Sequence, residues 1–161
     1  MGKLEELEAR IATLEEIEAI KRLKYAYWRC LDMKRWEELA TCFAPDASVE
    51  YGGGQYTFQG VEPIIDFLRR ALGTEAGHIG VHHGHQPEIE LTGATAANGT
   101  WALYNYFFNA GQNRCVRICA FYHDRYVKLG GAWKIAYTGY TTIFHEEWKR
   151  DDLPSLKQLV P

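Results

Sequence analysis

The chain has 161 residues, enough for one domain with a substantial hydrophobic core. Its net charge of -3 argues against a general nucleic-acid binder, and no apolar run approaches the roughly 20 residues that a membrane helix needs. Four cysteines without a CxxC pair or an export signal predict reduced thiols, no zinc and a cytoplasmic protein. Aromatic residues reach 14%, which favours an aromatic cavity or interface besides the core.

The first part of the chain has the spacing of two helices. Residues 3–31 form the first, with apolar side chains three and four apart at Leu4, Leu7, Ile11, Leu14, Ile17, Ile20, Leu23, Tyr27 and Leu31. Residues 1–14 are rich in glutamate, and we expect either an arm that packs on a partner or ordinary packing with a solvated acidic face. Lys34–Phe43 predicts a second short helix that ends at Ala44-Pro45-Asp46.

Strand patterns dominate the rest of the chain. Residues 47–59 predict a hairpin around Gly52-Gly53-Gly54, and residues 64–72 predict a helix with Pro63 in its first turn. Long strands are expected at 81–91, 96–109, 115–129 and 132–144, with glycine-containing turns between them. A short helix is expected at Asp152–Leu159.

This order of elements predicts an α+β fold, not a βαβ fold. A curved, mostly antiparallel sheet would wrap over the N-terminal helices as a cone-shaped barrel that leaves a blind cavity. We expect one domain over residues 1–161, with an arm at 1–14, a core at about 15–147 and a tail at 148–161.

Two distant polar residues are the leading candidates for chemistry. Asp32 lies in an aromatic-rich helical stretch, and His82 opens the run His82-His83-Gly84-His85. A carboxylate that faces an imidazole inside an apolar pocket makes a general base near neutral pH. Taken alone, Asp32 fits equally well as a helix-terminal acid bonded to backbone, and His82 as an ordinary strand histidine.

Five motifs accompany this pair along the chain. They are Ile20-Lys21-Arg22-Leu23-Lys24-Tyr25-Ala26-Tyr27, His82-His83-Gly84-His85-Gln86-Pro87-Glu88-Ile89, Ala97…Gly99-Thr100-Trp101, Tyr122-His123-Asp124-Arg125-Tyr126 and Gly131-Ala132-Trp133-Lys134-Ile135. As a set they resemble the SnoaL-like branch of the nuclear-transport-factor-2-like superfamily, over roughly residues 10–147. The nearest enzymes within that resemblance are the bile-acid 7α-dehydratases, and scytalone dehydratase and lindane dehydrochlorinase are more distant.

The resemblance implies a cofactor-independent lyase, most simply a dehydratase acting on a hydrophobic polycyclic or aromatic hydroxy-carbonyl compound. It implies that His82 is the base, that Asp32 orients it, and that Tyr27 and Tyr51 polarise the substrate oxygen. Further substrate contacts are expected from the side chains Asn105, Trp28, Phe107, Tyr122 and Thr142. It also implies homo-oligomers formed through the outer sheet face, with a trimer as first choice.

Two positions depart from the bile-acid dehydratases. Asn105 stands where those enzymes have an aspartate, and Thr142 stands where many relatives carry an arginine. We therefore expect a substrate other than a bile acid, with the same type of proton abstraction.

Two alternatives remain open at the level of sequence, and a third is disfavoured. The cavity can serve a non-catalytic module that binds lipophilic ligands or proteins, or the same base can drive an isomerase or cyclase reaction without loss of water. A metal site is disfavoured because His83 and His85 point to the opposite strand face from His82 unless a bulge at Gly84 or Pro87 changes the parity.

Overall fold

A computed structural model describes the chain except for residues 1, 76, 154, 156 and 158–161. The elements in order are α1 (Lys3–Asp32), α2 (Trp36–Ala40), β1 (Phe43–Tyr51), β2 (Tyr56–Gln59), α3 (Val61–Leu72), β3 (His78–Gly93), β4 (Ala96–Asn109), β5 (Arg114–Leu129), β6 (Ala132–Lys149) and the 3-10 turn η1 (Arg150–Asp152). The expected short helix at Asp152–Leu159 lies largely outside the described residues.

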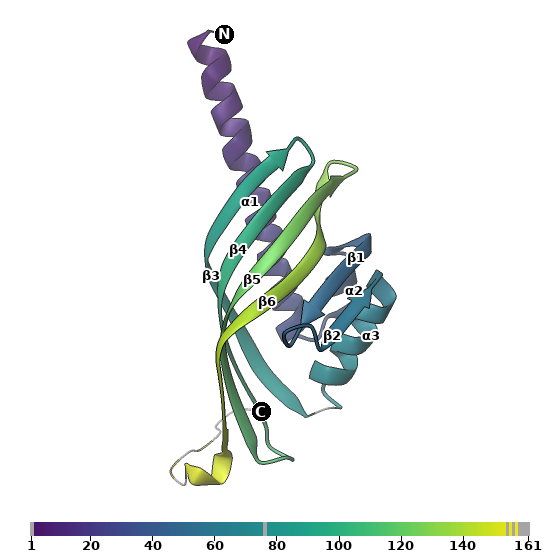
Figure 1. Cartoon of the computed structure of the whole chain (residues 1–161), viewed down its shortest axis with the longest axis vertical. Helices are drawn as coiled ribbons and strands as arrows, with labels where there is room; N and C mark the ends of the chain where they lie inside the picture. Colours follow the sequence, from purple (N-terminus) through teal and green to yellow (C-terminus); the bar gives the residue numbers. More distant parts are fainter. Residues whose placement is uncertain (1, 76, 154, 156, 158–161) are drawn as a thin grey trace.

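The strands form one strongly curved, unclosed sheet with the helices gathered against it (Figure 1). Its order is β2-β1-β6-β5-β4-β3. All neighbouring strands are antiparallel except β1 and β6, which run parallel. The predicted α+β class with a curved, mostly antiparallel sheet over N-terminal helices is confirmed.

Helix α1 has two parts that present different faces. Its C-terminal part buries Ile20, Tyr27 and Leu31 in the core, whereas the leucines and isoleucine at residues 4–14 are exposed. At about 100° per residue, two apolar side chains three residues apart are offset by about 60° around the helix. Leu14, Ile17, Ile20 and Leu23 are spaced in this way, so the stripe has moved by about 180° when it reaches Leu23. The stripe therefore does not continue along one face of the helix, as the sequence pattern suggested.

Two strand boundaries, the start of β1 and the end of β6, differ most from the expected ones. The chain becomes extended at Phe43, because the Cys42 carbonyl accepts the Ile135 N–H at 2.9 Å and Phe43 pairs with Ile135 in the parallel ladder. Pro45 falls at the register shift that follows, where a missing N–H is tolerated. At the other end, β6 runs on to Lys149 because it keeps pairing with β5 as far as Arg114.

Aromatic side chains fill the space between α1 and the sheet. Trp101 is fully buried and meets the Trp28 ring edge to face at 5.2 Å, and Trp28 also contacts Tyr122. Among the described residues, no helix is both long enough and apolar enough to span a bilayer. Tyr122 of this aromatic layer also lines a cavity, which α3 borders on another side.

Candidate active site

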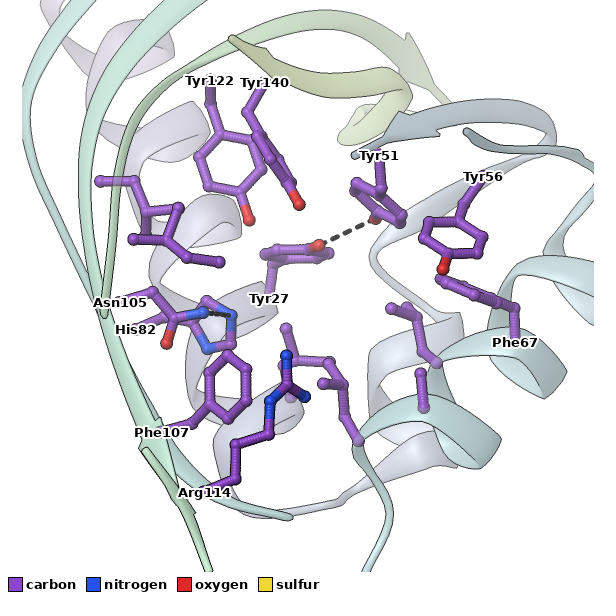
Figure 2. Close-up of a pocket in the computed structure, with 16 residues that line it drawn as sticks. Tyr27, Tyr51, Tyr56, Phe67, His82, Asn105, Phe107, Arg114, Tyr122 and Tyr140 are labelled. Carbon is purple, nitrogen blue, oxygen red and sulfur yellow. Dashed lines mark hydrogen bonds between the residues drawn. The ribbon is translucent and has the colours of Figure 1, made fainter. Parts of the chain in front are cut away.

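A cavity of about 350 Å³ lies between the C-terminal half of α1, helix α3 and the concave face of the sheet (Figure 2). Its lining is mostly aromatic and aliphatic, and the polar exceptions are His82, Asn105, Arg114 and the tyrosine hydroxyls. This volume is at the small end of the range for ligand-binding cavities. The cavity therefore suits a compact apolar molecule that a few polar groups orient.

Asp32 and His82 meet at one wall of this cavity. Asp32 Oδ1 lies 2.6 Å from His82 Nδ1, and Asp32 Oδ2 accepts the backbone N–H of His82 at 2.9 Å. The His82 side chain is 7% exposed and that of Asp32 is 19% exposed. Two bonds to the same residue fix the imidazole against the carboxylate, with its other nitrogen turned toward the cavity.

A glycine lets the helix approach the strand closely enough for this contact. The Trp28 ring of α1 packs onto Gly84 of β3, where an added Cβ would lie 1.9 Å from the ring. Any larger residue at position 84 would push α1 away from β3. Gly84 and Trp28 therefore set the spacing that brings Asp32, four residues beyond Trp28, to His82.

Asn105 completes the surroundings of the imidazole from β4. Its Nδ2 lies 3.2 Å from His82 Nε2, and its buried Oδ1 has no hydrogen-bond partner among the described residues. With Asp32 accepting at Nδ1 and the Asn105 amide donating at Nε2, the neutral ring carries its proton on Nδ1. Nε2, whose lone pair accepts the Asn105 amide, is then the basic atom at the cavity wall.

Tyr27 and Tyr51 form a second polar pair across the cavity. Their hydroxyl oxygens are 3.0 Å apart, and the two rings come from α1 and β1 (Figure 2). Burial raises the pKa of both phenols well above the ordinary value. Both tyrosines are therefore neutral hydrogen-bond donors near pH 7. Tyr27 is thus hydrogen-bonded to Tyr51, and Asp32 is hydrogen-bonded to His82. These are two separate pairs, although Tyr27 and Asp32 lie on the same helix.

A buried ion pair lies behind the tyrosines, outside the cavity lining. Lys24 Nζ is 2.8 Å from Asp124 Oδ2 and 3.2 Å from Thr138 Oγ1, and both charged side chains are fully buried. The ammonium sits 3.9 Å from the Tyr122 ring centroid and 4.6 Å from that of Tyr27. Burial lowers the pKa of Lys24, while Asp124 opposes that shift.

Arg114 brings a guanidinium to the cavity from the start of β5 (Figure 2). Its Nε and a terminal nitrogen each lie 2.8 Å from the Glu147 carboxylate. The hydrogen bond to Glu147 raises the pKa of Arg114 further. The pair is partly exposed, so the guanidinium can keep Glu147 as a partner while it faces a ligand.

The structure brings together most of the residues singled out in the sequence. The cavity is lined by Tyr27, Tyr51, His82, Asn105, Phe107 and Tyr122. Asp32 lies behind His82, facing a shallower hollow that it shares with Trp28.

Two expected substrate contacts, Trp28 and Thr142, do not line the cavity. Trp28 packs between Trp101 and Tyr122, and Thr142 is exposed on β6 beyond a register shift between β5 and β6. Sequence reasoning missed Arg114 and Tyr140, which do line it, and also the Lys24–Asp124 pair behind it. Lys24 and Asp124 are far apart in sequence, so no local pattern pairs them, although each lies inside one of the motifs quoted above.

His83 and His85 lie on the solvent side of β3, as the strand parity predicts. The bulge in β3 follows them, at Gln86, which has a φ of 53°. No group of three or more potential metal ligands occurs among the described residues.

Solved structures with the same fold include several elimination enzymes by name. A protein from Novosphingobium aromaticivorans provisionally named a scytalone dehydratase is 25% identical, with a TM-score of 0.77 over 84% of this chain and 89% of that chain. The hexachlorocyclohexane dehydrochlorinase LinA-type3 from Novosphingobium barchaimii is 20% identical, with a TM-score of 0.79 over 94% and 99%. An NTF2-like protein with a cystatin-like fold from N. aromaticivorans is 18% identical, with a TM-score of 0.68 over 89% and 92%.

The model of the SnoaL-like domain matches residues 12–138, from the first half of α1 into β6. This match spans most of the chain and contains Asp32, His82 and every cavity residue except Tyr140. The protein belongs to the SnoaL-like domain family.

Proposed function

We propose that the protein is a cofactor-independent lyase, of the dehydratase type, in which His82 removes a proton from a hydroxy-carbonyl compound. The observation that carries the proposal is the Asp32–His82 pair at 2.6 Å, with His82 Nε2 facing an apolar cavity. An imidazole held in one tautomer by a carboxylate is a recurrent general base.

The proposed reaction is an elimination. His82 Nε2 takes the proton α to the carbonyl, and the electrons of that C–H bond form the new C=C bond. The bond between the β-carbon and its hydroxyl oxygen breaks, and the imidazolium returns its proton to the leaving oxygen as water. The Asp32 carboxylate stabilises the imidazolium while it exists.

Tyr27 and Tyr51 are proposed to bind the carbonyl oxygen of the substrate. Because burial keeps both phenols neutral, either hydroxyl can donate to an oxygen that gains negative charge as the proton leaves. The two hydroxyls already share a hydrogen bond, so the pair offers one further proton to a ligand without breaking its own contact.

The cavity and the relatives both support a compact hydrophobic substrate. The cavity lining is chiefly aromatic, and a cavity volume of about 350 Å³ favours a substrate of one or a few fused rings over a large conjugate. The names of two proteins with this fold, scytalone dehydratase and hexachlorocyclohexane dehydrochlorinase, denote losses of water and of hydrogen chloride. We propose that Arg114 orients a polar or anionic end of the substrate at the cavity mouth.

The test is a screen of aromatic and polycyclic hydroxy-carbonyl compounds, read by product mass. Wild type should release a product lighter by one water, and Asp32→Asn and His82→Gln should each lower kcat by about 10²-fold or more. Equal turnover by wild type and His82→Gln would contradict the proposal. A product of unchanged mass that still depends on His82 would instead indicate isomerase or cyclase chemistry.

A non-catalytic binding module is the second candidate. The observation that favours it is the Asn105 amide, which donates to His82 Nε2 and so engages the lone pair that a base would use. In that case wild type and Asp32→Asn would bind the same apolar ligands with equal affinity, and neither would change them.

Association through the outer sheet face, with a trimer as first choice, is a proposal as well. Val81, Phe121 and Phe144 expose apolar surface on that face. The cytoplasmic location stays a prediction from sequence.

A further inference from the structure

The N-terminal part of α1 projects beyond the rest of the protein (Figure 1). We call residues 3–15 the arm, because each of their side chains is exposed and the first partly buried residue is Glu16. Glu16 accepts hydrogen bonds from Lys128 and Trp133 at 2.5 Å each, which fixes α1 to the turn between β5 and β6. The arm extends the helix about 20 Å beyond that contact.

Four large apolar side chains of the arm follow a heptad pattern. Leu4 and Ile11 occupy the a positions, and Leu7 and Leu14 occupy the d positions. The exposed fraction is 69% for Leu4, 42% for Leu7, 56% for Ile11 and 65% for Leu14. In the second heptad, Ile11 at a with Leu14 at d is the combination that favours two parallel strands in a coiled coil.

The charges beside this stripe match those of a second, parallel copy. The g positions are Lys3 and Arg10, and the e positions are Glu8 and Glu15. In a parallel pair, each g residue faces the e residue five positions later on the other helix, so Lys3 meets Glu8 and Arg10 meets Glu15. An antiparallel pair would set base against base and acid against acid.

The orientation of the stripe also leaves room for two folded bodies. At about 100° per residue, Leu4, Leu7, Ile11 and Leu14 lie within an arc of about 80°. The side chains that dock α1 on its own body, among them Ile20, Tyr27 and Leu31, point about 160° away from that arc. Two arms joined along the stripe therefore place their bodies on opposite outer sides.

We propose that the arms of two copies of this chain pair as a short parallel coiled coil. The folded body nucleates each arm helix, so pairing needs only propagation over two heptads. The arm lies outside the cavity, and this inference is independent of the proposed function.

Cysteine cross-linking tests the pairing and its direction. In a Cys119→Ser background, Leu7→Cys places one thiol per copy in the seam, and mild oxidation of the full-length protein should give disulfide-linked dimers. The matched control is Ala9→Cys, on the outer f position, which should give none. A cross-link that forms only between mixed Leu7→Cys and Ile11→Cys chains would show an antiparallel pair and overturn the proposal.

Charge exchange provides a second test that leaves the seam intact. The acidic-edge variant is Lys3→Glu/Arg10→Glu, and the basic-edge variant is Glu8→Lys/Glu15→Lys. In the Leu7→Cys background each variant alone should lose the cross-linked dimer, and an equal mixture should restore it as a mixed dimer. Cross-linking of either variant alone at the wild-type level would contradict the pairing, since these exposed substitutions leave the fold unchanged.

Discussion

The buried Lys24–Asp124 pair gives the sharpest prediction about stability. Lys24→Met keeps a long side chain against Tyr27 and Tyr122 but removes the ammonium that lies 2.8 Å from Asp124 Oδ2. The carboxylate then keeps only the Tyr126 hydroxyl, which donates at 2.6 Å, while Oδ1 has no partner among the described residues. Removal of one member of a fully buried ion pair costs about 3–5 kcal/mol.

A double substitution separates the lost charge from lost packing. Asp124→Asn removes the unpaired charge and keeps a hydrogen-bonding group for Tyr126. The variant Lys24→Met/Asp124→Asn should therefore be more stable than Lys24→Met alone by at least about 1 kcal/mol. Urea unfolding followed by tryptophan fluorescence measures each free energy of unfolding.

A penalty below about 1 kcal/mol for Lys24→Met, or a double variant as unstable as the sum of the single ones, would refute the assignment of the cost to an unpaired buried charge.

Three further predictions concern the site and its surroundings. Burial lowers the pKa of His78 from its ordinary 6.5 to about 4, so the unfolded chain takes up this proton at a higher pH than the folded protein. The free energy of unfolding should therefore fall as the pH drops below about 6.5, by about 3 kcal/mol once the pH is under 4. In His78→Gln, urea unfolding at a series of pH values should lack this decrease. Tyr27→Phe should lower kcat by about 10²-fold and cost about 1 kcal/mol of stability, because the buried Tyr51 hydroxyl loses this hydrogen bond. Tyr106→Phe, outside the cavity lining, should not alter turnover. Arg114→Met should raise KM about tenfold at nearly constant kcat for substrates with an anionic end, and Arg117→Met, whose guanidinium pairs with Glu146 outside the cavity lining, is the matched control.

Periodicity was sufficient for most of the fold. The helix at residues 3–31 and the strand at 96–109 match α1 and β4 almost residue for residue, because long patterns with glycine turns leave few alternatives. Periodicity gave the wrong element at Phe43, where pairing with β6 outweighs the local helix preference. It also gave the wrong end for β6, whose length depends on its partner β5. Strand ends depend on neighbours that are distant in sequence.

The site was harder to predict from the sequence than the fold. Asp32 and His82 stood out by residue type and by resemblance, and the structure places them in contact. Arg114 did not stand out, because nothing in the sequence of its strand indicates that the strand brings this side chain to the cavity. Thr142 was assigned by position alone, and its strand presents it to solvent instead. Which strand residues face a cavity depends on sheet curvature and bulges, which leave weak traces in a sequence.

The central claim is that Asp32 holds His82 with its proton on Nδ1, so that Nε2 at the cavity wall carries no proton and can act as the base. Nitrogen-15 NMR of the ring nitrogens, at a pH where His82 is neutral, tests it without knowledge of the substrate. We expect the proton on Nδ1 in wild type and a mixture of both tautomers in Asp32→Asn. A wild-type ring with its proton on Nε2 would contradict the account, because that nitrogen could not then act as the base.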